Sequence, residues 1–175
     1  RYMRDRVTMW NDLVEHPNYD AYWQQRNLLP HLKRVAPAVL IVGGWFDAED
    51  LYGPLQIYRR VEAENPGIAN NLVMGPWSHG GWRRGRGDHL GDVDFESNTA
   101  AFYRKRIETA FFHDHLKEGI PPRLPEAYVF ETGTNRWRQF DHWPPQNAAS
   151  RRLYMQPGGR LEFKAPNESG EVFGE

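Results

Sequence analysis

The sequence contains no cysteine among its 175 residues, which excludes disulfides, thiolate metal sites and a cysteine nucleophile. It also carries little net charge, since 22 Lys and Arg against 23 Asp and Glu give a formal value of −1. A general nucleic-acid binder needs a marked basic excess to neutralise phosphates, so no nucleic-acid partner is expected. No apolar run approaches the roughly 18 residues that cross a bilayer, so no membrane partner is expected either.

Residues 36–117 alternate between strand and helix patterns. A β-branched run over 36–44, bounded by Pro and Gly, predicts a fully buried strand. A period near 3.6 predicts a helix over 51–64, and the pattern repeats with a strand at 71–74 and a helix over 97–117. This β-α-β-α order predicts an α/β fold, with a parallel sheet and flanking helices.

The patterns on either side of this region differ from it. Residues 1–35 consist of short helical pieces joined by turns, which is typical of a capping segment. After residue 124, short strand patterns are separated by Gly, Asn and Pro turns. We therefore expect a helical cap-like segment over 1–35, an α/β domain over 36–124 and the start of a β-sandwich over 125–175. We also expect the chain to be a piece of a longer protein.

Two loops are predicted to leave the carboxyl ends of neighbouring strands, where ligands bind in such sheets. The first carries Asp47 and the second carries His79, 32 residues further on, which is about one strand–helix unit. An acid followed by a histidine in this order is what a Ser-His-Asp triad requires downstream of its serine. The imidazole takes the serine proton, and the carboxylate holds the imidazole tautomer. The spacing alone also fits a helix-capping Asp and an ordinary loop His.

The segments GWFDAED (44–50) and MGPWSH (74–79) closely resemble the α-amino-acid ester hydrolases. These enzymes form a wider group with cocaine esterase, glutaryl cephalosporin acylase and X-Pro dipeptidyl peptidase. Residues 16–23, 90–96 and 131–137 are similar as well, so the likeness covers nearly the whole chain. It implies the carboxy-terminal part of an α/β-hydrolase domain, followed by the start of a jelly-roll-like β-sandwich.

The resemblance also implies roles for individual residues. Asp47 corresponds to the triad acid and His79 to the general base. Glu49 and Asp50 match two carboxylates that help to bind the α-ammonium group of the substrate in the amino-acid ester hydrolases. The chemistry agrees, because a buried ammonium needs paired carboxylates to offset its desolvation. Alternatively, this pair only complements the dipole of the helix that follows.

Two tryptophans, Trp45 and Trp77, flank the acid and the base. They are candidate substrate-contacting residues, although tryptophans at such positions more often serve packing. His113 and His115 look like a metal-binding pair, but residues two apart on a helix point to different faces. No metal and no cofactor are therefore expected.

The nucleophile is absent from these residues. None of the four serines lies in a G-x-S-x-G turn; they are Ser78, Ser97, Ser150 and Ser169. Ser78 adjoins His79, but neighbours in one loop rarely meet in attack geometry. We expect the serine and the oxyanion-hole groups in a missing amino-terminal part, and we expect this chain to be inactive alone.

The expected function is that of a serine hydrolase of acyl esters or amides, above all α-amino-acid esters or β-lactam side-chain acyl groups. Within the group, a broader carboxylesterase, a glutaryl acylase or an X-Pro peptidase remains open. Outside it, the alternatives are an aromatic-rich binding module, given 14% aromatic residues, and a metal-dependent hydrolase that uses the acidic loop around Asp92. The likeness implies a homo-oligomer. The natural substrate stays open, as does the compartment, whether periplasmic, secreted or cytoplasmic.

Overall fold

The computed structural model describes residues 6–117 and 124–166. The chain divides into two compact units, Arg1–Trp143 and Pro144–Glu175. Among the described residues, no helix combines the length and the apolar character needed to span a bilayer.

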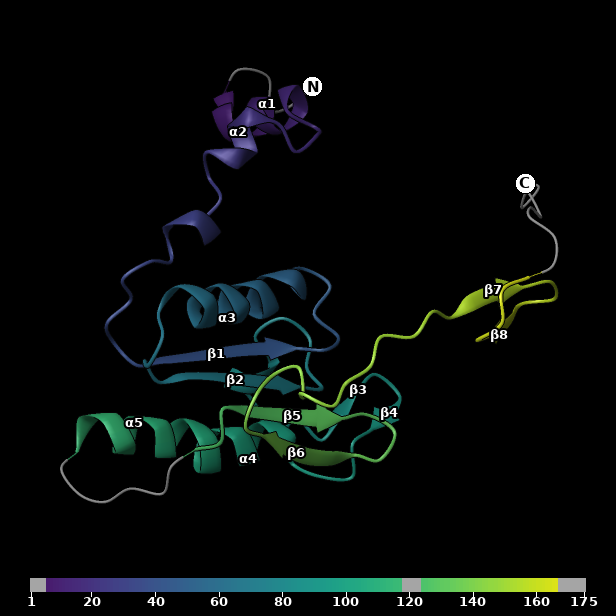
Figure 1. Cartoon of the computed structure of the whole chain (residues 1–175). Helices are drawn as coiled ribbons and strands as arrows, with labels where there is room; N and C mark the ends of the chain where they lie inside the picture. Colours follow the sequence, from purple (N-terminus) through teal and green to yellow (C-terminus); the bar gives the residue numbers. More distant parts are fainter. Residues whose placement is uncertain (1–5, 118–123, 167–175) are drawn as a thin grey trace. The chain divides into compact units, whose positions relative to one another are not determined.

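A four-stranded mixed sheet forms the centre of the first unit, in the order β1-β2-β5-β6 (Figure 1). Strands β1 (Val39–Gly44), β2 (Asn70–Gly75) and β5 (Ala127–Glu131) run parallel, and β6 (Arg136–Phe140) pairs antiparallel with β5. Gly44 lies opposite Gly75 in the register of β1 and β2. These two strands therefore end at the same level, and the loops that follow them leave the sheet side by side.

Helices cover both faces of this sheet (Figure 1). On one face, α3 (Tyr52–Glu64) packs through Tyr58 onto the cluster of Ile41, Leu72, Met74, Ala127 and Val129. On the other face, α4 (Thr99–Phe102), the π-helical η4 (Tyr103–Glu108) and α5 (Thr109–Leu116) follow one another. Ala100, Tyr103 and Ile107 from these helices pack with Val73 and Trp77. Alternate strand residues face opposite sides, so β1 and β2 each supply both clusters.

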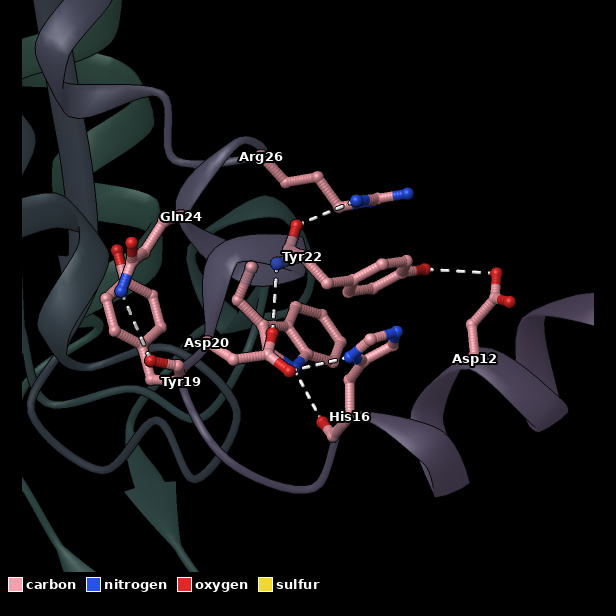
Figure 2. A network of polar contacts seen from close by, with 8 residues as sticks. Asp12, His16, Tyr19, Asp20, Tyr22, Gln24 and Arg26 are labelled. Atoms are coloured by element: carbon pink, nitrogen blue, oxygen red, sulfur yellow. Dashed lines mark hydrogen bonds and ion pairs between the residues drawn. The ribbon is translucent and has the colours of Figure 1, made fainter.

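Short elements precede the sheet. They are α1 (Thr8–Glu15), α2 (Ala21–Gln24) and the 3₁₀ turn η2 (Leu29–His31). Asp20 begins α2 by accepting the backbone N–H of Tyr22 at 2.9 Å, as an N-cap residue does. Its other carboxylate oxygen lies 2.6 Å from Nδ1 of His16, so one aspartate joins the turn to the helix (Figure 2).

A buried asparagine ties this segment to the α/β layers. Asn65, only 6% exposed, follows the last residue of α3. Its Oδ1 accepts the backbone N–H of Val35 at 2.7 Å, and its Nδ2 donates to the carbonyls of Leu32 and Val61 at 2.9 and 3.0 Å. The connection into β1 is therefore held against the end of α3 by side-chain hydrogen bonds.

The remaining described elements are small. Between β2 and α4 lie the 3₁₀ turn η3 (Gly81–Arg83) and the two-residue strands β3 (His89–Leu90) and β4 (Val93–Asp94). In the second unit, β7 (Tyr154–Gln156) and β8 (Arg160–Glu162) form an antiparallel hairpin.

The fold differs from the sequence prediction in the placement of two strands. Residues 127–140, which we expected to open a separate β-sandwich, instead continue the main sheet as β5 and β6. Short strands separated by turns look alike whether they extend a sheet or begin a new one, and only the pairing of β5 with β2 distinguishes the two. That residues 144–175 belong to a sandwich stays a prediction.

Candidate functional site

The loops after β1 and β2 are locked together by their backbones. Trp45 donates its N–H to the carbonyl of Gly75 at 2.8 Å, and Phe46 donates to that of Trp77 at 3.1 Å. Gly44 permits this approach, because a Cβ there would lie 2.1 Å from the carbonyl oxygen of Trp77. A side chain at that position would force the two loops apart.

This junction brings Asp47 and His79 together. Nδ1 of His79 lies 3.0 Å from Oδ2 of Asp47. The other carboxylate oxygen, Oδ1, accepts the backbone N–H groups of Glu49 and Asp50, both at 2.9 Å. The carboxylate of Asp47 is 2% exposed, whereas the imidazole of His79 is 54% exposed. The acid is therefore fixed in the protein interior while the ring reaches towards solvent.

The electrostatics of the pair follow from these contacts. The backbone hydrogen bond from Asp50 does most to lower the pKa of Asp47, and those from Glu49 and His79 add to it. The hydrogen bond to Asp47 does most to raise the pKa of His79, followed by the negative charges of Asp47 and Glu49. Both shifts favour a carboxylate beside an imidazole that binds a proton readily.

The two carboxylates after the acid have different surroundings. Glu49 is 73% exposed, and its Oε2 lies 3.9 Å from Nε2 of His79, the ring nitrogen that Asp47 leaves free. Asp50 instead accepts the backbone N–H of Gly53 at 2.6 Å, at the start of α3. The helix-start role considered for this pair thus describes Asp50, whereas Glu49 stands beside the imidazole.

The two tryptophans that flank the acid and the base are anchored by their indole N–H groups. Trp77 is 3% exposed and donates to Oγ1 of the fully buried Thr99 at 2.8 Å. The hydroxyl of Thr99 in turn donates to the carbonyl of Gly87. Trp45 donates to the carbonyl of Phe130 at 2.9 Å. These placements favour packing roles and show that Thr99 supports the loop of His79. Sequence reasoning missed Thr99, although a buried indole N–H requires an acceptor.

The described serines of the first unit offer no hydrogen-bond partner for the imidazole. Ser78 is exposed in the same loop, and Ser97 donates to the carbonyl of Phe95 at 3.3 Å. Ser169 lies outside the described residues. Within the described ranges, no group of three or more His, Asp or Glu side chains is arranged to hold a metal ion.

A mixed sheet with helices on both faces, and an Asp–His pair after neighbouring parallel strands, is the arrangement of the α/β-hydrolase class. Residues 1–81 match the family described as X-Pro dipeptidyl-peptidase (S15 family). Cocaine esterase of Rhodococcus sp. (strain MB1 Bresler) is 30% identical over 162 residues, which cover 88% of this chain and 26% of that protein.

Two solved structures are similar over most of the chain. An aminopeptidase from a marine sediment archaeon, Thaumarchaeota archaeon, has a TM-score of 0.86 and 36% identity, covering 95% of this chain and 27% of its own. An α-amino acid ester hydrolase has a TM-score of 0.83 and 32% identity, covering 93% of this chain and 28% of its own. The chain is thus similar to members of the group that contains cocaine esterase and the X-Pro dipeptidyl peptidases. It spans about a quarter of the length of these relatives.

The surroundings of His79 predict its titration. Because Asp47 and Glu49 raise its pKa, we expect its NMR midpoint above the ordinary value of about 6.5. Asp47→Asn should lower the midpoint most, and Glu49→Gln should lower it less. The pairing also contributes to stability. Its contribution is fully present below the pKa that His79 has in the unfolded chain, and it is lost as pH rises through the raised pKa of His79 in the folded chain. An unchanged midpoint in Asp47→Asn would contradict the pairing.

The support from Thr99 predicts a stability effect. Thr99→Val keeps the shape but leaves the indole N–H of Trp77 without its acceptor, so urea unfolding should show a loss of about 1–3 kcal/mol. Thr109 provides a matched control, because its hydroxyl also donates to a backbone carbonyl, that of Arg104, but at an exposed position. Thr109→Val should change stability by less than about 0.5 kcal/mol. Equal losses in the two variants would show that the buried indole contact is unimportant.

Proposed function

We propose that the complete protein containing this chain is a serine hydrolase of acyl esters or amides. Its preferred substrates are α-amino-acid esters or related acyl groups such as β-lactam side chains. In this proposal Asp47 is the triad acid, His79 is the general base, and the serine belongs to the part of the protein upstream of Arg1. The observation that carries the proposal is the 3.0 Å contact between Oδ2 of Asp47 and Nδ1 of His79 at the carboxyl edge of the sheet.

The hydrogen bond to Asp47 sets the chemistry of the imidazole. A carboxylate oxygen only accepts, so the ring keeps its proton on Nδ1 and leaves the lone pair of Nε2 free. Nε2 then takes the serine proton as the serine oxygen attacks the acyl carbon, and it returns a proton to the leaving group. Water repeats the sequence on the acyl-enzyme. Throughout, Asp47 stabilises the imidazolium and stays ionised, in agreement with its lowered pKa.

The length of the relatives supports the upstream position of the serine. Cocaine esterase and the two solved structures are about four times as long as the part of them that this chain matches. In the α/β-hydrolase order, the serine precedes the acid and the acid precedes the histidine. Asp47 and His79 occur in that order here, so the remaining partner is expected earlier in the protein.

The carboxylate of Glu49 supports a substrate with an α-ammonium group. It lies on the Nε2 side of His79 and is 73% exposed, so an ammonium next to the reacting carbonyl could pair with it. The second oxygen of Asp50 is the further acceptor that we assign to this group, since its Oδ1 is used by Gly53. Each charge-assisted hydrogen bond of this kind contributes about 1.5–3 kcal/mol when it is shielded from water.

A peptidase that recognises a free amino terminus is the second candidate. The same carboxylate would bind the terminal ammonium of a peptide as well as that of an amino-acid ester. The similarity to the archaeal aminopeptidase, which covers 95% of this chain, supports this candidate. A comparison of amino-acid esters with dipeptide amides as substrates of the complete protein distinguishes the ester hydrolase from the peptidase.

Changing the acid tests the triad assignment. In the complete protein, Asp47→Asn should lower kcat by up to about 10⁴-fold, because the amide favours the wrong imidazole tautomer. The parent should also react with a fluorophosphonate and keep its activity in EDTA. Asp88 offers a matched control, since its Oδ1 lies 3.0 Å from Nδ1 of His89 in an exposed loop pair. Asp88→Asn should retain activity. Near-normal activity of Asp47→Asn would assign the acid elsewhere.

A matched pair of substrates tests the role of Glu49. Acetylation of the α-amine should lower kcat/KM of the parent at least about tenfold, through loss of a charge-assisted hydrogen bond. In Glu49→Gln, the free-amine substrate should fall to nearly the rate of the acetylated one. If the parent does not distinguish the two substrates, a broader carboxylesterase without a need for a free amine is the better description.

A further inference from the structure

A pocket of about 620 Å³ lies at the amino-terminal edge of the sheet, where β2 and β5 begin. Three acidic residues line it: Glu62 of α3, Asp114 of α5 and Glu126, which directly precedes β5. Its volume is within the range of small-molecule sites, about 300–1,000 Å³. We propose that this pocket binds a small organic cation that carries a guanidinium group on an apolar stem.

The pocket and the Asp47–His79 pair lie at opposite edges of the sheet. β2 begins at Asn70, which lines the pocket, and ends at Gly75, after which the loop of His79 leaves the sheet. Strand residues advance about 3.3 Å each, so about 16 Å separate these two ends of β2. A ligand in this pocket is therefore not the group that the proposed triad attacks, and the pocket is a second site.

A buried amide oxygen of this pocket lacks a hydrogen-bond donor. Asn70 is 4% exposed, and its Nδ2 donates to the carbonyl of Tyr58 at 3.2 Å and to Oε1 of Glu62 at 2.7 Å. Its Oδ1 is without a donor among the described residues, and so is the buried Oδ1 of Asp114. Native proteins rarely leave buried acceptors unpaired. Two such oxygens in the walls of one pocket indicate a ligand that brings N–H donors.

The charge around the pocket selects a cation. Its described lining residues include no Lys and no Arg, and His115, whose ring lies 4.7 Å from that of Phe111, is the one among them that can carry a positive charge. Helices α3 and α5 run opposite to the strands and end on the side where the strands begin (Figure 1). The negative ends of two helix dipoles therefore add to the charge of the carboxylates at this edge.

The acceptors suit a guanidinium better than a metal ion. Within the described ranges, no three His, Asp or Glu side chains are arranged to hold a metal ion. Oε2 of Glu126 lies 3.2 Å from Nδ1 of His142, so this carboxylate already has a partner. Glu62 and Asp114 are left as the charged acceptors, one from each helical layer. A guanidinium presents five N–H donors in a planar fork and so pairs with several such oxygens at once.

The pocket also has an apolar wall. Ile68, in the turn before β2, and Leu124, before β5, both line it and are both partly exposed. An alkyl chain that covers these side chains removes apolar surface from water, which is favourable. The site therefore suits an alkylguanidinium better than a small inorganic cation.

Calorimetric titration of the complete protein tests the chemistry of the ligand. Butylguanidinium should bind at least about tenfold more tightly than butyltrimethylammonium, because only the former has N–H donors. It should also bind at least about fivefold more tightly than methylguanidinium, which lacks the apolar stem. Equal binding of butylguanidinium and butyltrimethylammonium would overturn the assigned hydrogen bonding, and no binding of butylguanidinium would overturn the proposal.

Single variants locate the binding. Asp114→Asn and Glu62→Gln should each weaken butylguanidinium at least about fivefold, through loss of a charged acceptor. Glu64 and Asp141 provide matched controls that do not line the pocket. Glu64 ends α3 and pairs with Arg60, and Asp141 is exposed just after β6, whose end lies beside the start of β5.

The control variants remove the same charge from the same edge of the sheet. Glu64→Gln and Asp141→Asn should therefore bind butylguanidinium within about twofold of the parent. Equal weakening by all four variants would show attraction to the overall negative charge instead of binding in the pocket, and would overturn the proposal.

The acid loop is the competing location for a cation, because Glu49 is proposed to bind an ammonium. Glu49→Gln should bind butylguanidinium as the parent does. If Glu49→Gln weakens the binding and the variants of Glu62 and Asp114 do not, the cation binds at the catalytic edge and the pocket proposal fails. If the pocket variants weaken binding but Asp47→Asn stays active, the pocket stands and the proposed triad fails.

Discussion

The junction between the loops that follow β1 and β2 is the constraint on which the candidate site depends. Parallel pairing in register brings Gly44 level with Gly75, and two backbone hydrogen bonds then carry the contact beyond the end of the sheet. Because glycine has no side chain, the carbonyl of Trp77 can approach the backbone of Gly44. Because both loops are fixed at this level, Asp47 and His79 meet although a whole helix separates them in the chain. Thr99 adds support from the opposite helical layer through the indole of Trp77.

Three neighbouring carboxylates carry out different tasks because their surroundings differ. Asp47 is buried and saturated with donors, so it stays ionised and orients His79. Asp50 receives the N–H of Gly53 and takes part in the start of α3. Glu49 is left exposed beside the free ring nitrogen. A motif of closely spaced acids is therefore divided between structure, orientation and contact with solvent. We assign Glu49, which is exposed beside the free ring nitrogen, to the substrate, with the second oxygen of Asp50 as a further acceptor.

The strands and helices of the α/β region could be predicted from the sequence, because buried parallel strands and amphipathic helices have strong local patterns. The strands predicted at 36–44 and 71–74 correspond to β1 and β2, and the helix over 51–64 to α3. The strands at 127–140 were also found, but their placement in a separate sandwich was wrong. Their local pattern specifies a hairpin and contains no information about which strand it joins. The π-helical stretch within the helix predicted over 97–117 was not predicted from the local sequence pattern either.

The order of Asp47 and His79 along the chain, on loops after successive strands, predicted the pair but also fitted a capping Asp and an ordinary loop His. The resemblance of the two loop motifs to a known family favoured the pair. The distance within the pair, the division of tasks between Glu49 and Asp50, and the role of Thr99 came only with the tertiary structure. The physical reason is the range of the interactions. Strand and helix patterns, and the order of motifs, arise from neighbours in sequence. Hydrogen bonds between side chains more than twenty residues apart depend on how the layers pack, which a local pattern does not encode.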